Sequence, residues 1–215
     1  HTAVANEIEK QPIDLRILVD ISRSVRTSLP DNQHLDAIRM LIQQLPENSR
    51  AGIWTYGKYV NYLVKQGPVS KFWRKNAVAQ IQRIRSVAAH RNIEAALGKA
   101  AYDLARPIKG YQKVLLLISS GGMQISDVKS ENQLAEERVR IELLPKLRAA
   151  GYQIHTIALN PDTDNNLMVD LAKETGGFSF VLESSQDIYR YSQMLAQWVA
   201  PANSLPLIDR QFAVD

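Results

Sequence analysis

Short apolar runs alternate along this chain with longer segments of helical periodicity, and this alternation constrains the fold most strongly. Three runs have the length of a buried strand: residues 14–21 (DLRILVDI), 113–118 (KVLLLI) and 152–159 (YQIHTIAL). Each is mostly apolar, which is typical of a parallel strand covered on both faces. Strands that alternate with helices of ten or more residues predict an α/β fold with a largely parallel sheet between two layers of helices.

The remaining segments predict the helices and one hairpin. Residues 51–56 and 59–65 flank Gly57 and predict a hairpin of two short strands. The spacing of Phe72, Val78, Ile81 and Ile84 predicts an amphipathic helix with these side chains inward. Further helices are expected at 35–45, 92–105, 131–150 (kinked by Pro145 and ended by Gly151), 165–175 and 185–199 (capped by Ser185), and a last strand at 178–182.

Length and composition limit the classes of protein to consider. With 215 residues, 45% of them hydrophobic, the chain can form one large domain with a real core. It has no cysteine, which excludes a disulfide scaffold, thiolate zinc sites and a cysteine nucleophile. No apolar run approaches the roughly 18 residues of a transmembrane helix. We expect a lead-in at 1–12, the domain at 13–200, and a linker or the first strand of a following domain at 201–215.

Charge is distributed unevenly along the chain, which carries a formal net charge of +4. Between Glu47 and Glu94 there is no acidic residue, whereas residues 127–142 are rich in glutamate. Such asymmetry indicates either a charged face for a partner or an ordinary solvated surface. Residues 72–75 (FWRK) resemble the aromatic and basic clusters of nucleic-acid binders, but amphipathic helix packing explains them, so nucleic acid is not expected as a partner.

The loop after the first apolar run carries one carboxylate and two hydroxyls at alternate positions, Asp20, Ser22 and Ser24. In parallel sheets, ligands bind beyond the carboxyl ends of the strands, so this loop lies at the expected position of a site. Hard oxygen ligands of this kind suit Mg²⁺, Ca²⁺ or Mn²⁺. A helix-capping loop has the same composition, and the three residues alone do not distinguish the two interpretations.

Five segments in chain order carry a resemblance to a known family. They are the first strand with Asp20, Ser22 and Ser24, then residues 92–97 (NIEAAL), 115–122 (LLLISSGG), 152–160 (YQIHTIALN) and 170–180 (DLAKETGGFSF). Together they resemble the von Willebrand factor type A (VWA) domain over residues 13–200. The resemblance implies a Rossmann-like, doubly wound sheet and a non-enzymatic adhesion or scaffold module that binds a protein partner.

The resemblance also implies a metal-ion-dependent adhesion site, in which a divalent ion leaves one coordination position for a partner's carboxylate. Asp20, Ser22 and Ser24 match its first loop. Arg91 stands where the family has threonine, and Ser120 stands where it has aspartate. A guanidinium is permanently charged and cannot coordinate a metal. One hypothesis is therefore a degenerate site in which Arg91 neutralises Asp20, with no cofactor or only weakly bound Mg²⁺. In the other, Arg91 points to solvent and Mg²⁺ is still held.

The sequence offers no catalytic constellation. The four histidines lack the spacing of metal ligands, and residues 119–122 (SSGG) fit neither a phosphate-binding loop nor a nucleophile elbow. We therefore expect recognition of a protein partner, one of acidic character, through Arg23, Arg26, Arg91 and Ser120, on the face built by residues 22–26, 89–92 and 119–124. Bacterial members of the family often work in the periplasm or outside the cell. A start at His1 fits a removed signal peptide or a cloning boundary equally.

Overall fold

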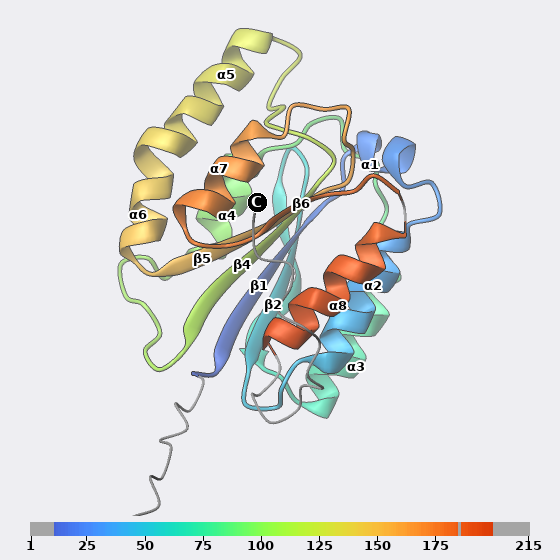
Figure 1. Cartoon of the computed structure of the whole chain (residues 1–215), viewed down its shortest axis with the longest axis vertical. Coiled ribbons are helices and arrows are strands. Elements are labelled where there is room, and N and C mark those ends of the chain that lie inside the picture. Colours follow the sequence, from blue (N-terminus) through green and yellow to red (C-terminus); the bar gives the residue numbers. More distant parts are fainter. Residues whose placement is uncertain (1–10, 185, 200–215) are drawn as a thin grey trace, which may run out of the picture.

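Strand β1 (Ile13–Asp20) lies in the middle of a six-stranded sheet in the computed structural model, which describes residues 11–184 and 186–199 (Figure 1). The strand order is β3-β2-β1-β4-β5-β6, and among these strands only β3 runs antiparallel, to β2. The predicted mostly parallel sheet and the hairpin are confirmed. The other strands are β2 (Arg50–Tyr56), β3 (Val60–Pro68), β4 (Gln112–Ser119), β5 (Tyr152–Ala158) and β6 (Ser179–Val181).

Side chains alternate between two cores along β1, and all eight of its residues are buried. Leu15, Ile17 and Val19 pack into the core on one face, and Leu18 packs into the core on the other. A strand covered on both faces has no solvent side, which explains its nearly continuous apolar sequence.

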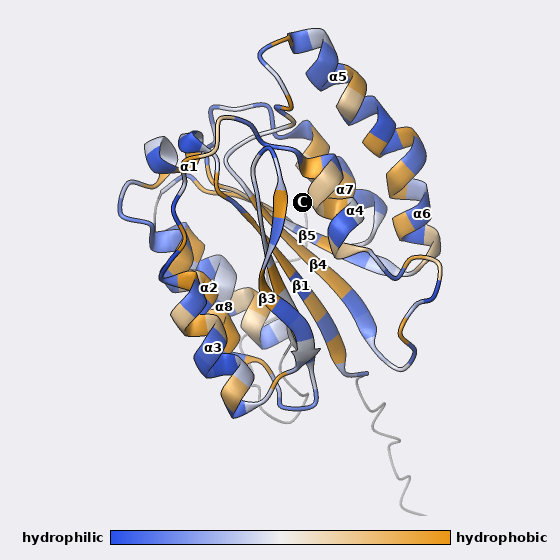
Figure 2. Ribbon diagram, turned by 180° about the vertical axis from the view of Figure 1, so that it is seen from behind, coloured by the Kyte–Doolittle hydropathy of each residue, from blue (hydrophilic) through white to orange (hydrophobic). Residues whose placement is uncertain are grey.

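Helices cover both faces of the sheet, as Figure 2 shows by the apolar strands enclosed between them. One layer contains α2 (Gln33–Gln44), α3 (Lys71–Ile81) and α8 (Asp187–Val199). The other contains α4 (Ile93–Ala100), α5 (Lys129–Arg138), α6 (Leu144–Ala149) and α7 (Asn166–Glu174). A short helix, α1 (Arg23–Ser28), lies beside the carboxyl ends of the strands. The sequence predicted a loop at 22–26, so this helix was not expected.

The inward face of α3 differs from the prediction at its first position. Ser70 caps the helix, since its Oγ accepts a hydrogen bond from the Trp73 amide at 3.1 Å. Trp73, Ala77 and Ile81 then repeat every four residues and are buried. Phe72 precedes this series by one residue, so it is 82% exposed and not part of the core. The predicted inward placement of Phe72 was wrong.

The predicted long helix over 131–150 is present, but it begins at Lys129 and is divided. Between α5 and α6 lies the π-helical segment η1 (Val139–Leu143), which ends two residues before Pro145. Proline lacks an amide hydrogen and its ring crowds the carbonyl of the fourth preceding residue. The wider π turn accommodates that conflict without breaking the helix axis, and the helix ends at Ala149 before Gly151, whose φ is +78°.

Two other predicted boundaries changed. The helix expected to reach residue 105 ends at Ala100, whose carbonyl accepts a hydrogen bond from the buried Arg16 side chain instead of continuing the helix. The last helix is described from Asp187. Its predicted cap Ser185, the lead-in except for Gln11 and Pro12, and the tail 201–215 lie outside the described residues.

Candidate functional site

Loops from three parts of the chain meet at the carboxyl ends of the central strands. Asp20 ends β1, Ser22 and Ser24 lie at the start of α1, and Ser120 directly follows β4. Because β1 and β4 are neighbouring parallel strands paired through Val19 and Ile118, these side chains lie at the same edge of the sheet. After β1 the chain continues to β2 on one side of it, whereas β4 pairs with β1 on the other side. The strand order therefore reverses direction between β1 and β4, which makes their carboxyl ends the topological switch point of the sheet.

Asp20 is fully buried and both of its carboxylate oxygens accept hydrogen bonds. Oδ1 accepts from the Ser22 amide at 2.7 Å. Oδ2 accepts from the amide and the hydroxyl of Ser120, at 2.9 and 2.6 Å. These bonds hold the two loops together and satisfy the charge of a carboxylate removed from water.

Three hydroxyls form a compact group beside this carboxylate. The Oγ atoms of Ser24 and Ser120 are 2.8 Å apart, those of Ser22 and Ser24 are 2.9 Å apart, and those of Ser22 and Ser120 are 3.3 Å apart. Each hydroxyl has one proton and two lone pairs, so three of them together retain acceptor capacity for a further donor.

Arg91 supplies that donor. Its Nη1 donates to Ser24 Oγ at 2.8 Å and to Ser120 Oγ at 3.1 Å, and lies 3.4 Å from Ser22 Oγ. Its Nε lies 4.0 Å from Asp20 Oδ2, and the side chain is only 8% exposed. The guanidinium therefore points inward, into the centre of the hydroxyl group.

The backbone around Arg91 fixes the direction of its side chain. Its amide and carbonyl exchange hydrogen bonds with Gln124 at 2.7 and 2.9 Å, and its Nε donates to the carbonyl of Gly122 at 2.8 Å. Gly121 leaves the room for this arrangement, because a Cβ there would lie 2.9 Å from Arg91 Nη2.

Two further arginines lie on the rim of the site. Arg23 and Arg26 are exposed on α1 and, with Thr27 and Pro30, line an open hollow of about 370 Å³. Arg23 Nε donates to the Val87 carbonyl at 3.2 Å, whereas neither arginine takes part in an ion pair among the described residues. The predicted residues thus divide into a buried cluster and an exposed basic rim.

Sequence reasoning missed Tyr56, which ends β2 directly beside Asp20 in the sheet register. Its hydroxyl donates to the Ile118 carbonyl at 3.0 Å. Burial, followed by the nearby Asp20 charge, raises the pKa of Tyr56 well above its ordinary value. Tyr56 could have been predicted from its position at the carboxyl end of β2, because the carboxyl ends of neighbouring parallel strands lie at the same edge of the sheet.

The histidines do not contribute a metal cluster. No group of three or more histidine, cysteine, aspartate or glutamate side chains with metal-binding geometry occurs among the described residues. His155 is a core residue, as expected, and its Nδ1 accepts from the Phe178 amide at 3.0 Å. Burial lowers the pKa of His155 and of His34 to about 4, so both are neutral at pH 7.

A doubly wound sheet with an aspartate and serine hydroxyls at its switch point defines a class of ligand-binding α/β domains. Comparison with protein families matches residues 14–193 to the von Willebrand factor type A domain. The chain belongs to this family, whose domains are typically non-catalytic modules for adhesion and protein interaction.

Solved structures of similar fold share little sequence with this chain. A von Willebrand factor type A protein from Catenulispora acidiphila has a TM-score of 0.73 and 11% identity over 88% of this chain and 43% of its own. The vWF domain of the type V pili tip protein Mfa5 from Porphyromonas gingivalis has a TM-score of 0.65 and 11% identity, over 88% and 95%. Proximal thread matrix protein 1 from the mussel byssus, with a zinc-occupied MIDAS motif, has a TM-score of 0.63 and 14% identity, over 87% and 48%.

The chain thus spans less than half the length of the first of these structures. A comparison with curated proteins finds no match. Among the described residues, no helix is both long and apolar enough to cross a membrane.

Proposed function

We propose that this domain is a non-enzymatic protein-interaction module that binds an acidic partner through the face built by residues 22–26, 89–92 and 119–124, without needing a divalent cation. One observation carries the proposal: Arg91 Nη1 lies within hydrogen-bond distance of the hydroxyls of Ser24 and Ser120 and close to that of Ser22. A permanent positive charge in that position neutralises the carboxylate of Asp20, as a bound metal ion would.

The donor set fits a guanidinium better than a hard dication. A divalent ion of this kind takes six or more oxygen ligands and favours carboxylates, but Asp20 is the only carboxylate in the cluster. Both of its oxygens already accept hydrogen bonds. A cation that entered between the hydroxyls would be repelled by the nearby permanent positive charge of Arg91.

Recognition on this face then falls to the exposed arginines. Arg23 and Arg26 present two guanidinium groups around the open hollow of about 370 Å³. A guanidinium binds a carboxylate through paired hydrogen bonds, so an aspartate or glutamate of the partner is the matching chemistry. Arg91 and Ser120 are buried, so their proposed part in recognition is to hold together the loops that form this face. The pili tip protein of similar fold supports a site of action in the periplasm or outside the cell.

Magnesium binding separates this proposal from a metal-dependent adhesion domain that recognises a partner's carboxylate through the ion. We expect no saturable heat and no rise in melting temperature when Mg²⁺, Ca²⁺ or Mn²⁺ is added up to about 10 mM, above the range of weak calcium modules. Calorimetry and thermal melting of the metal-stripped domain measure this. Saturable binding that disappears in Asp20→Ala contradicts the proposal and supports the metal-dependent alternative.

Binding of an acidic peptide tests the recognition surface itself. We expect a fluorescein-labelled oligo-glutamate peptide to bind the domain equally well with EDTA or with Mg²⁺, and Arg23→Ala/Arg26→Ala to weaken binding about tenfold, since two charge-assisted contacts are lost. Fluorescence anisotropy gives the dissociation constants. Lys99→Ala/Lys109→Ala removes as much charge from exposed positions elsewhere and serves as the control.

Peptide binding that survives loss of Arg23 and Arg26 but disappears when Lys71 and Lys75 are changed contradicts the assignment. The recognition surface would then lie on α3, away from the strand ends.

A further inference from the structure

Two surfaces of opposite charge lie on opposite sides of the molecule and remain outside the site described above. The basic surface lies on the β3 hairpin, on α3 and on the turn after α3. Its exposed cations are Lys58, Lys65, Lys71, Lys75, Arg83 and Arg85. The acidic surface lies on the segment that leads into α5 and along α5 and η1. Its exposed carboxylates are Asp127, Glu131, Glu137 and Glu142.

Most of the charge on the two surfaces is left uncompensated within the chain, although the exposed Lys129 and the interaction of Glu142 with Arg138 reduce that of the acidic surface in part. None of these ten side chains takes part in an ion pair among the described residues. Other charges near the acidic helix are paired, since Arg138 binds Glu94 at 2.7 Å and Arg140 binds Asp170 at 2.9 Å. The charges that define the two surfaces are therefore available to an external partner.

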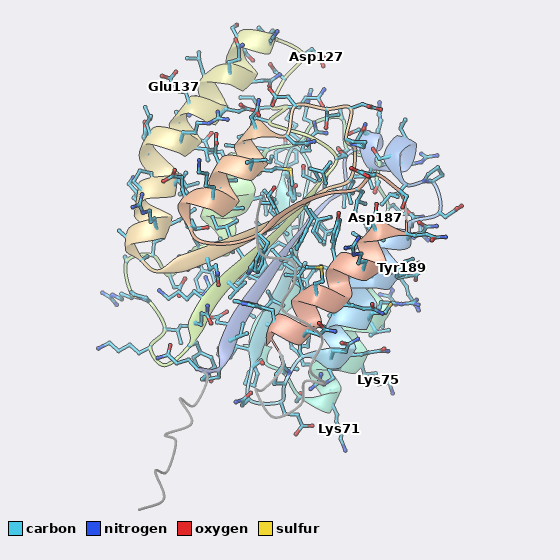
Figure 3. All side chains as sticks on the ribbon, viewed as in Figure 1. Lys71, Lys75, Asp127, Glu137, Asp187 and Tyr189 are labelled. Carbon is cyan, nitrogen blue, oxygen red and sulfur yellow. The ribbon has the colours of Figure 1, made fainter. Side chains whose placement is uncertain are left out.

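Their positions prevent one surface from neutralising the other within one molecule. α3 packs on one face of the sheet beside the edge strand β3, and the helix that contains α5 packs on the other face. Figure 3 shows the result, with Lys71 and Lys75 at the lower end of the molecule, and with Asp127, just before α5, and Glu137, on α5, at the upper end. Only a different molecule can bring the two kinds of charge together.

Both surfaces also expose large apolar side chains among the charges. Phe72 and Tyr59 are 82% and 70% exposed on the basic surface. Leu134 and Ile141 are 56% and 64% exposed on the acidic surface. Exposed apolar groups surrounded by charges are typical of protein interfaces, because burial of the apolar groups supplies affinity and the charged rim fixes orientation.

We propose that the acidic surface of one copy binds the basic surface of a second copy, so that the chain self-associates head to tail. The argument is charge complementarity: one chain carries both halves of the interface, with the same mixture of apolar and charged groups. Because the two halves differ, the contact is heterologous, and repeating it builds linear assemblies unless the rotation closes a ring. Arg23 and Arg26 belong to neither surface, although Arg23 lies beside the basic one, where its Nε donates to the carbonyl of Val87.

Salt dependence is the first expected result. Exposed ion pairs contribute little individually and are screened by salt, with a Debye length of about 10 Å at 0.1 M and about 3 Å at 1 M. We expect the weight-average mass of the 215-residue chain to rise with protein concentration at about 0.1 M NaCl and to return to that of the monomer at about 1 M. Sedimentation velocity measures both.

Charge reversal gives a sharper test. Lys71→Glu/Lys75→Glu lowers the charge of the six-cation basic surface from +6 to +2, and Asp127→Lys/Glu137→Lys changes that of the four-carboxylate acidic surface from −4 to 0, so each variant alone should associate at least about tenfold more weakly. Mixed in equal amounts, the two variants should associate with each other, because each now supplies the surface that the other lacks. Lys99→Glu/Lys109→Glu changes net charge as much as the first variant does, at exposed positions outside both surfaces, and should still associate.

Three results would overturn the proposal: a wild-type chain that stays monomeric at low salt, association that persists in both charge-reversal variants, or a mixture of the two that does not associate. Circular dichroism of each variant verifies that the fold is intact. Binding of the wild-type monomer to anionic vesicles that is lost in Lys71→Glu/Lys75→Glu, without self-association, would assign the basic surface to that other partner and equally contradict the proposal.

Discussion

Replacing Arg16 by methionine is expected to lower the free energy of unfolding by about 3–5 kcal/mol, because it breaks a buried ion network and leaves two buried carboxylates without their cationic partner. Arg16 lies on β1, is fully buried, and points toward α4. Its guanidinium binds Asp103 at 2.6 and 3.0 Å and Asp14 at 3.0 and 3.2 Å. The Tyr152 hydroxyl accepts a further bond from Nη1 at 2.8 Å.

The network connects the central strand to the chain segment that follows α4. Burial works against the charge, but the carboxylates of Asp103 and Asp14 outweigh it and raise the pKa of Arg16 above its ordinary value. Methionine preserves much of the volume, so the loss comes from the unpaired acids and not from a cavity. Urea denaturation measures the change. Arg39→Met removes a partly exposed ion pair with Asp36 and should change stability by less than about 1 kcal/mol.

The pH dependence of unfolding distinguishes lost charge pairing from lost packing. Burial raises the pKa of Asp103, but hydrogen bonds from Arg16 and Tyr152 dominate and hold it below its ordinary value. Asp103 thus stabilises the fold above its unfolded pKa, and this contribution disappears as pH falls toward its folded pKa. The Arg16→Met variant should lose the part of this acid sensitivity that Arg16 supplies, while the Tyr152 hydrogen bond remains. A variant as stable as the wild type at pH 7, or one that is destabilised equally at all pH values, would contradict the charge argument.

The sequence predicted the sheet well because burial on both faces makes its strands nearly continuous apolar runs. It predicted the helices less well where a single distant contact decides their ends. The arrest of α4 at Ala100 depends on Arg16, which is 84 residues away in the chain. The exposure of Phe72 depends on whether the helix begins one residue earlier or later, and the apolar pattern alone does not decide that.

In the candidate site, too, some features follow from local sequence and others depend on contacts between distant parts of the chain. Asp20, Ser22, Ser24 and Ser120 could be brought together from sequence, because strand ends in a parallel sheet share one edge. The direction of the Arg91 side chain could not, since it follows from backbone bonds to Gln124 and from the space above Gly121. Both contacts join loops that are about 30 residues apart, and local sequence does not encode them.

Arg91→Thr/Ser120→Asp is expected to create a divalent-metal site where, on our proposal, the wild-type domain needs none. The change removes the guanidinium from the hydroxyl group and adds a second carboxylate beside Asp20, whose Oδ2 is 2.6 Å from Ser120 Oγ in the present structure. The set then offers two carboxylates and three hydroxyls, the oxygen ligands that suit Mg²⁺. Without metal, two neighbouring carboxylates repel each other, so the double variant should melt below the wild type.

Magnesium should then restore the stability of this double variant. A ligand that binds only the folded state at 100 times its dissociation constant stabilises it by about 2.7 kcal/mol, which is roughly a 5–10 °C rise in melting temperature for a domain of this size. Ser120→Asp alone keeps Arg91, which would pair with the new carboxylate, so this matched single variant should not respond to Mg²⁺. Adding Asp20→Asn to the double variant should abolish the response. A folded double variant that ignores Mg²⁺, or a wild type that responds as strongly, would show that the guanidinium of Arg91 is not what replaces the ion.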